Sequence, residues 1–167
     1  MAIVDQGGAI RVTGVDKVLA RLDEKIKAVK FRTKGGLIKA GLLIQRQAQQ
    51  KTPVDTGNLK SGAFTIWSGS PSKPPSVPSF SDKKGGSQDR SRDHAAALSE
   101  SKAEANVLGN TGGPTVIVGF SAAYAIYVHE GIQGAGREGV KFLENAVRNN
   151  QRNILAAIQG EVSKETL

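Results

Sequence analysis

Residues 52–58 read TPVDTGN, and this heptapeptide separates a helical pattern from a strand pattern. Pro53 cannot continue a helix, Asp55 can bond its own backbone two residues on, and Gly57 tolerates a positive φ. Thr52, Pro53, Asp55 and Gly57 are therefore predicted to form a structural turn between a helix and a sheet. We expect the Asp55 side chain to cap or bridge this turn through backbone N–H groups.

The Asp-Thr-Gly triplet is also the catalytic loop of dimeric aspartic proteases. Ile117-Val118-Gly119 stands at the distance where such a protease needs an apolar pair followed by Gly. That fold is all-β, however, whereas a long helical pattern leads into Thr52. The protease dyad also needs shielded carboxylates that share a proton, and Lys51 and Lys60 indicate a wet, polar neighbourhood. The turn is favoured, and the protease stays an alternative.

The helical pattern begins near the N-terminus. Gly35-Gly36 predicts a break or a kink in it, and a second helical stretch follows from Leu37 to Ala48, ending before Pro53. The first stretch is an amphipathic helix with one apolar stripe. The stripe consists of Val15, Val18, Leu19, Leu22, Ile26 and Val29.

Two strands are predicted on the other side of the turn. Leu59 to Trp67 contains alternation, residues 115–120 form a more apolar run, and the two would pair as a hairpin. Residues 122–131 fit a helix or a strand, residues 140–158 fit a helix, and Gly160 is a plausible stop. The chain is thus predicted to be one α+β domain over residues 1–167. Long N-terminal helices and a C-terminal helix would pack on a small antiparallel sheet, with a long inter-strand insertion.

The insertion between the two strands covers residues 68–113. Its first part, residues 68–93, holds four prolines and many Ser, Gly and charged residues. Such a composition buries too little apolar surface to offset its ordering entropy. His94 to Ala105 is Ala-rich and could form a short helix, and Gly109 to Pro114 is again loop. We expect residues 68–113 to be a Pro/Ser/Gly-rich arm that becomes ordered against a neighbour.

Composition excludes several kinds of chemistry. The chain has no Cys, which excludes disulfides, thiolate metal sites and thiol nucleophiles. His129-Glu130 lacks the second His of a zinc-protease helix. Residues 134–139 match GxGxxG, but too little chain follows for the second strand of a dinucleotide site. No apolar run approaches the roughly 18 residues of a membrane span. We therefore predict no catalytic residue, no cofactor, no metal and no membrane contact.

The net charge of +8 is concentrated in the first third of the chain. Residues 1–60 carry 12 Lys and Arg against 5 Asp and Glu, a balance of 12 − 5 = +7. This surface is expected to face an acidic protein partner or DNA, unless it is simply a solvated face. The acidic partner is favoured because Asp and Glu on the first helix would repel phosphate. The candidate DNA- or partner-facing residues are Lys17, Arg21, Lys25, Lys27, Lys30, Arg32, Lys34 and Lys39.

Two stretches together resemble a known family. Residues 52–61, TPVDTGNLKS, are similar to its "TPVDTG-x-L-[RK]-x-S" signature, and residues 124–131, YAIYVHEG, followed by 141–146, KFLENA, are similar to its "YA-x-YVE-x-G … PFL-x-x-A" block. The family is the neck, or head–tail joining, family of long-tailed bacteriophages, also described as minor capsid or tail-component proteins. Lys141 replaces the family's Pro. The motif or interface positions carried over are Leu59, Tyr124, Tyr127, Glu130, Gly131, Phe142 and Leu143.

The resemblance implies a non-enzymatic virion protein. It would form a homo-oligomeric ring of six or twelve subunits in the neck, joining the DNA-filled head to the tail after assembly in the bacterial cytoplasm. Its neighbours would be a head-side adaptor or stopper ring and a tail-side terminator ring, with genomic DNA passing through the channel. A tail terminator or tail-completion ring is the nearest alternative. A DNA-binding protein is an alternative of a different class.

Overall fold

A computed structural model describes residues 2–4, 10–12, 15–53, 58–71, 87–131 and 141–165. The fold is α+β, which confirms the predicted fold class. The helices are α1 (Val15–Lys51), α2 (Asn58–Ser61), α3 (Ser87–Gly112), α4 (Ala125–Glu130), α5 (Phe142–Asn149), α6 (Gln151–Val162) and the 3₁₀ turn η1 (Ser163–Glu165). The strands are β1 (Ala2–Val4), β2 (Ile10–Val12), β3 (Ala63–Trp67) and β4 (Val116–Phe120).

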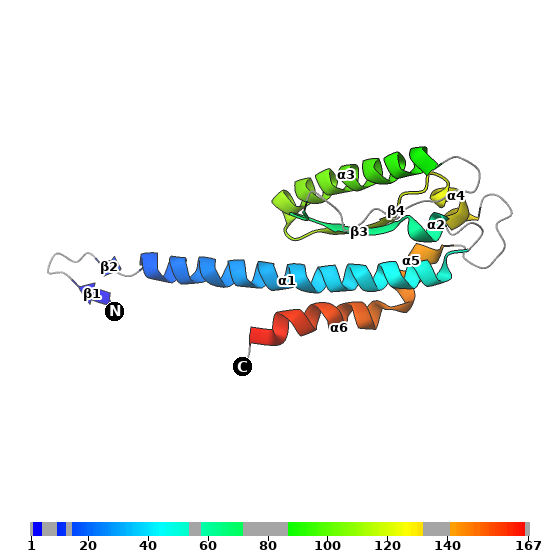
Figure 1. Cartoon of the computed structure of the whole chain (residues 1–167). Coiled ribbons are helices and arrows are strands. Elements are labelled where there is room, and N and C mark those ends of the chain that lie inside the picture. Colours follow the sequence, from blue (N-terminus) through cyan, green and yellow to red (C-terminus); the bar gives the residue numbers. More distant parts are fainter. Residues whose placement is uncertain are drawn as a thin grey trace.

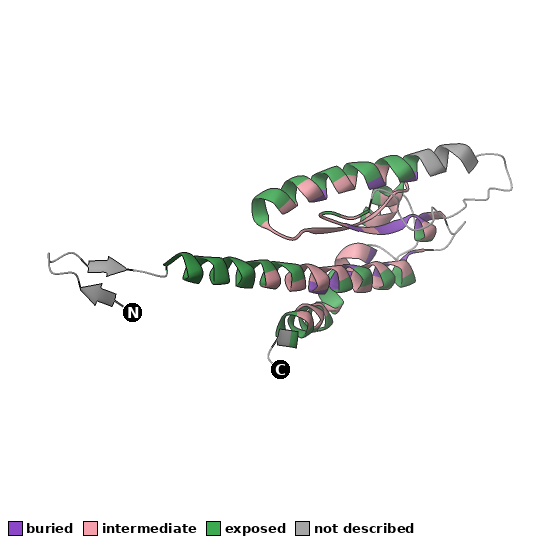
Figure 2. Cartoon of the chain, turned by 60° about the vertical axis from the view of Figure 1, so that its left-hand side comes forward, coloured by how far each residue is buried: buried purple, intermediate pink, exposed green. Residues whose placement is uncertain are grey.

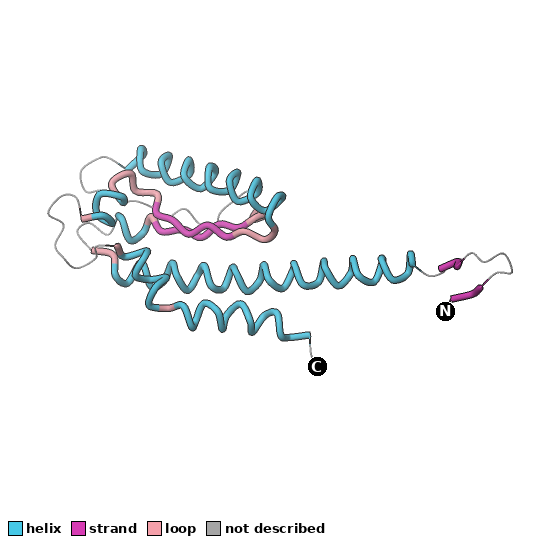
Figure 3. Tube along the Cα trace, turned by 180° about the vertical axis from the view of Figure 1, so that it is seen from behind, coloured by secondary structure: helices cyan, strands magenta, loops and turns pink. Residues whose placement is uncertain are grey.

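The elements stack in layers (Figure 1). Helix α3 covers one face of the β3–β4 sheet, the second half of α1 covers the other face, and α6 packs on the far side of α1. The first half of α1 extends beyond all of these layers, which is also plain from behind (Figure 3). The molecule is therefore a layered body from which a single helix projects.

Strands β3 and β4 pair antiparallel, as predicted, although a long segment separates them in the sequence. Ala63 lies opposite Phe120 and Trp67 opposite Val116. Phe64 lies opposite Gly119, where a Cβ would come within 2.7 Å of the Phe64 ring. A side chain at position 119 would displace this ring.

The predicted break at Gly35-Gly36 is wrong, because α1 runs through both glycines. The reason is close packing between helices. A Cβ on Gly36 would lie 2.8 Å from the Ile158 Cα of α6, and a Cβ on Gly41 would lie 2.7 Å from Val116 Cγ1 of β4. Glycine costs helix stability, but at these two positions it lets α6 and the sheet approach α1.

Two other predicted boundaries are corrected, and one open alternative is decided. The strand predicted from Leu59 starts only at Ala63, because residues 58–61 form the helical turn α2. The ambiguous stretch 122–131 contains helix α4. The C-terminal helix is divided at Asn150 into α5 and α6, and it continues past Gly160 to Val162.

The prediction that residues 68–113 lack a core is wrong for residues 87–112. They form α3, a longer helix than the one predicted, which includes most of the loop expected at 109–114. Leu98 and Ala105 of α3 are buried against Phe64 and Ile66 of β3. The prediction failed because one face of this Ala-rich helix carries small and apolar residues, which pack on the sheet and bury it. Residues 72–86, which include most of the predicted proline-rich arm, lie outside the described residues.

Candidate interaction surface

The two motif blocks meet in one part of the core. Leu59, from the first block, packs with Phe142 and Ala146, from the second, and with Ala48 of α1. Leu59 is 5% exposed and Phe142 is 2% exposed. Leu143 packs against the same cluster. These residues carry internal packing, and an outside partner cannot reach Leu59 or Phe142.

Half of the predicted structural turn is described. Thr52 is buried, and its Oγ1 donates a hydrogen bond of 2.7 Å to the carbonyl oxygen of Ala48. This bond satisfies a carbonyl near the C-terminal end of α1, where helices leave such groups unpaired. Pro53 follows, half-buried. Asp55 and Gly57 lie outside the described residues, so their predicted roles stay predictions.

The exposed part of the second block is helix α4. Tyr124 and Tyr127 are both exposed, and the Tyr124 hydroxyl accepts a 3.2 Å hydrogen bond from Asn58 of the first block. Glu130 is exposed and contacts His129 Nδ1 at 2.9 Å. Gly131 ends the helix with φ at 70°, in the left-handed region that favours glycine. Of the motif residues, the two tyrosines and Glu130 are the exposed ones, while Gly131 and Leu143 are half-buried.

Lys141, which stands where the family has Pro, precedes α5 with φ at 57°. Proline cannot adopt this conformation, because its ring holds φ near −65°. A proline at position 141 would therefore require a different backbone conformation at the start of α5. The Lys141 side chain makes an exposed ion pair with Glu144 at 3.4 Å.

Among the described residues, the predicted stripe on the first half of α1 is exposed. All six stripe residues are exposed, with Val18 at 66% and Leu22 at 54% (Figure 2). The heptad-like spacing of residues 15, 19, 22, 26 and 29 continues through 33, 36 and 40, where Gly36 and Ala40 are buried. The stripe is thus one continuous face of α1 that the described part of the chain covers only in its second half. Hereafter residues 15–31 are called the α1 arm.

The predicted basic residues divide along α1. Lys39 is used within the chain, where it bonds Glu161 of α6. The pKa of Glu161 is lowered to about 2 by hydrogen bonds from Lys164 and Lys39. Arg32 and Lys34 are half-buried. Lys39 is exposed despite its bond to Glu161, and the other exposed members belong to the α1 arm, namely Lys17, Arg21, Lys25, Lys27 and Lys30.

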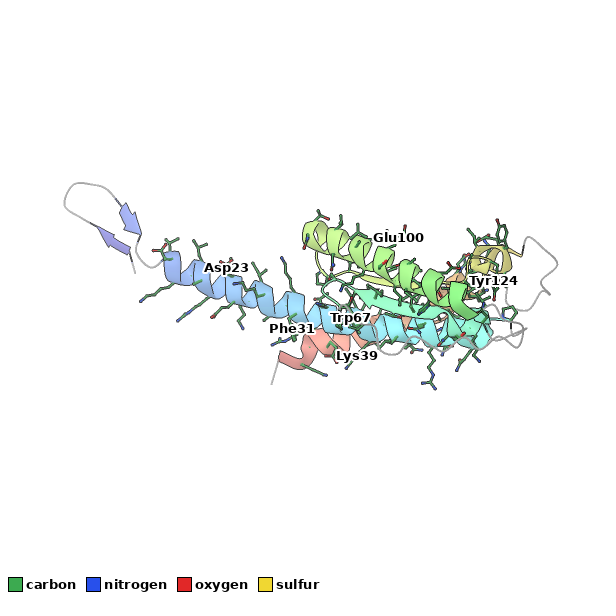
Figure 4. The ribbon with its side chains drawn as sticks, turned by 45° about the horizontal axis from the view of Figure 1, so that its top comes forward. Asp23, Phe31, Lys39, Trp67, Glu100 and Tyr124 are labelled. Carbon is green, nitrogen blue, oxygen red and sulfur yellow. The ribbon has the colours of Figure 1, made fainter. Side chains whose placement is uncertain are left out.

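Sequence reasoning missed an acidic surface on α3. Asp93, Glu100 and Glu104 are exposed and follow at steps of seven and four, which places them on one side of the helix. Figure 4 labels Glu100 on α3, Asp23 and Phe31 on the α1 arm, and Tyr124 at the other end of the molecule. The spacing was visible in the sequence, but reading residues 68–113 as a coreless arm hid it.

The described residues contain no cluster of three or more His, Cys, Asp or Glu placed to hold a metal ion. None of the described helices is long and apolar enough to cross a membrane. Comparison of the chain with protein-family models, curated proteins and solved structures gives no match.

Proposed function

We propose that this chain is a non-enzymatic subunit of a homo-oligomeric ring in the neck of a long-tailed bacteriophage, where the ring joins the DNA-filled head to the tail. The observation that carries the proposal is the α1 arm. Its six stripe residues are exposed, although the same face of the same helix is packed beyond Gly36. An exposed apolar patch of this kind marks a contact with another chain.

The family motifs add support of a different kind. The resemblance rests on two blocks that are far apart in the sequence, and residues of both pack in one cluster around Leu59 and Phe142. Asn58 and Tyr124 also join the blocks on the surface. Residues that pack together constrain each other's size and shape. The presence of both motifs in one chain is therefore a more specific sign of the family than either motif alone.

The charge of the arm favours protein neighbours over DNA along the channel. Residues 15–31 carry five Lys and Arg against three Asp and Glu, a balance of 5 − 3 = +2. An apolar stripe bordered by mixed charges suits a helix or a sheet face of another protein. A DNA-facing wall would need cations without such a stripe, since phosphate contacts are electrostatic.

The test is electron microscopy of the purified chain in negative stain, over a range of concentrations. We expect closed rings that average to six or twelve subunits. The variant Leu22→Glu should abolish the rings because it places a charge in the stripe. Arg152→Glu, on an exposed position of α6, is the matched control and should leave them intact.

A chain that stays monomeric at every concentration would contradict the proposal. Peptidase activity that Asp55→Asn abolishes would contradict it too, and would favour the protease.

A further inference from the structure

We propose that the α1 arm of one copy of this chain docks on the outer face of α3 of a second copy. The inference rests on the proposed ring and assigns the two surfaces that close it. The outer face of α3 is the side turned away from the sheet, and it includes Ala96, Ser99, Glu100, Ala103, Glu104 and Val107, all exposed.

The shapes of the two surfaces match. The arm presents large side chains, among them Leu19, Leu22 and Ile26, in one row. The facing surface on α3 has small residues, Ala96 and Ala103, on the row where an opposing helix would lie. Large residues of one helix pack between small residues of another at short interhelical distances. Both stretches are similar in length, because residues 15–31 and 93–111 each span about 25–28 Å of helix.

The charges of the two surfaces are complementary. Lys17, Arg21 and Lys25 follow at steps of four along one side of the arm, whose balance over residues 15–31 is 5 − 3 = +2. Residues 93–112 of α3 carry three acidic residues against one Lys, a balance of 1 − 3 = −2. Complementary borders fix the register of a helix pair and exclude wrong partners.

The same charges disfavour pairing of two arms. Two copies of a surface with a balance of +2 repel each other, and like-charge juxtaposition opposes association. Docking of the arm on α3 joins two different surfaces of the same chain. Such a contact repeats from subunit to subunit and produces a closed ring when the rotation between neighbours closes.

Cross-linking tests the contact directly, because the chain has no Cys of its own. Ile26 and Ser99 each lie three residues from the middle of their surface, so they come opposite each other if the helices run antiparallel and about 9 Å apart along the axis if they run parallel. The full-length variants Ile26→Cys and Ser99→Cys, one of them enlarged by a tag, are mixed and treated with a short bis-maleimide. We expect a mixed dimer as the main product. Ile26→Cys with Arg152→Cys is the control and should give none.

A charge exchange tests the specificity. The double variant Arg21→Glu with Lys25→Glu should weaken self-association by about tenfold or more, and so should Glu100→Lys with Glu104→Lys. Mixed together, the two variants can dock alternately, acidic arm on basic α3 and basic arm on acidic α3. The mixture should therefore restore rings with an even number of subunits.

The outcomes separate this inference from the proposed function. Wild-type rings, without the Ile26–Ser99 product and without recovery in the mixture, would overturn the docking and leave the ring standing. Self-cross-linking of Ile26→Cys alone would overturn it in favour of paired arms. Absence of any oligomer would overturn both. The neck function is tested separately, by deleting the chain in a phage. If head–tail joining stays normal there while the mixed dimer and the recovered rings are found in vitro, the docking is supported and the neck function is overturned.

Discussion

Thr52 and His94 are the buried polar side chains among the described residues, and each is tied to a specific partner. Thr52 bonds the Ala48 carbonyl, while His94 Nδ1 lies 2.6 Å from Ser121 Oγ. His94 also meets the Phe64 ring edge to face. The first contact closes the end of α1, and the second joins α3 to the segment after β4. Each of these two side-chain contacts therefore helps to fix the position of a helix.

Replacing Thr52 by Val keeps the shape of the side chain and removes its hydroxyl. The Ala48 carbonyl then loses its partner, and we expect the free energy of unfolding to fall by about 1 kcal/mol. Urea titration followed by circular dichroism measures the change. Thr52→Ser, which keeps the hydroxyl, is the control for the bond. Equal stability of Thr52→Val and wild type would show that the bond contributes nothing.

His94 makes stability depend on pH. Burial lowers the pKa of His94 below its ordinary value of 6.5, so the folded state holds the proton less tightly than the unfolded state does. Protonation of His94 then favours unfolding. The stability that the neutral, buried His94 contributes is lost as pH falls below about 6.5. We expect the denaturation midpoint to decline from pH 7 to pH 5, and to decline less in His94→Gln.

The carboxylate of Glu161 titrates in a separate window. Its pKa is lowered from 4.5 to about 2, so its contribution is present above about pH 4.5 and is lost only as pH falls toward 2. A decline of equal size in wild type and His94→Gln between pH 7 and pH 5 would exclude His94 as the cause.

At the scale of elements, local patterns predicted the types well. The stripe at steps of three and four predicted a helix, and two apolar runs predicted the paired strands β3 and β4. The errors arose where contacts distant in sequence decide. Gly36 is a helix breaker by propensity, but Ile158, more than a hundred residues on, makes it a packing position. The composition of residues 68–93 likewise concealed the first turns of α3, so the helix predicted for residues 94–105 is longer than expected.

The two adjacent glycines of α1 provide a matched pair. Gly36→Ala places a Cβ 2.8 Å from the Ile158 Cα, and such overpacking typically costs about 1–3 kcal/mol. At Gly35 the nearest atom to a Cβ is Glu161 Oε2, at an ordinary 3.8 Å. Gly35→Ala should therefore raise stability by up to about 1 kcal/mol through helix propensity. Thermal unfolding of both variants is the measurement, and equal effects would contradict close packing at Gly36.

At the scale of the whole molecule, the sequence pattern could not reveal what covers a face. The arm and the packed half of α1 have the same periodicity, but only the packed half has α6 and the sheet beside it. The motif residues Leu59 and Phe142 resembled interface positions and are core. Conversely, the acidic residues of α3 form a surface only because the helix lies on the outside of the sheet.

Hydrogen exchange should divide α1 in two. Amides of residues 18–30 belong to a helix without tertiary cover and should exchange fast in the isolated chain, whereas those of residues 40–48 should exchange slowly. Assembly should slow the exchange of the first group by covering the stripe. Exchange is measured by mass spectrometry below and above the concentration at which rings form. Uniform slow exchange along α1 in the monomer would contradict an uncovered arm.

Because α1 is continuous through Gly36, the arm and the packed half of the helix tilt together as one rigid rod. Val15 lies 21 residues from Gly36, about 32 Å along the helix, so a tilt of about 5° at the packed end moves the tip by about 3 Å. The angle between the arm and the rest of the molecule depends on how closely Ile158 packs against Gly36 and Val116 against Gly41. A substitution at one of these buried contacts can therefore leave the fold intact and still change the diameter of the proposed ring.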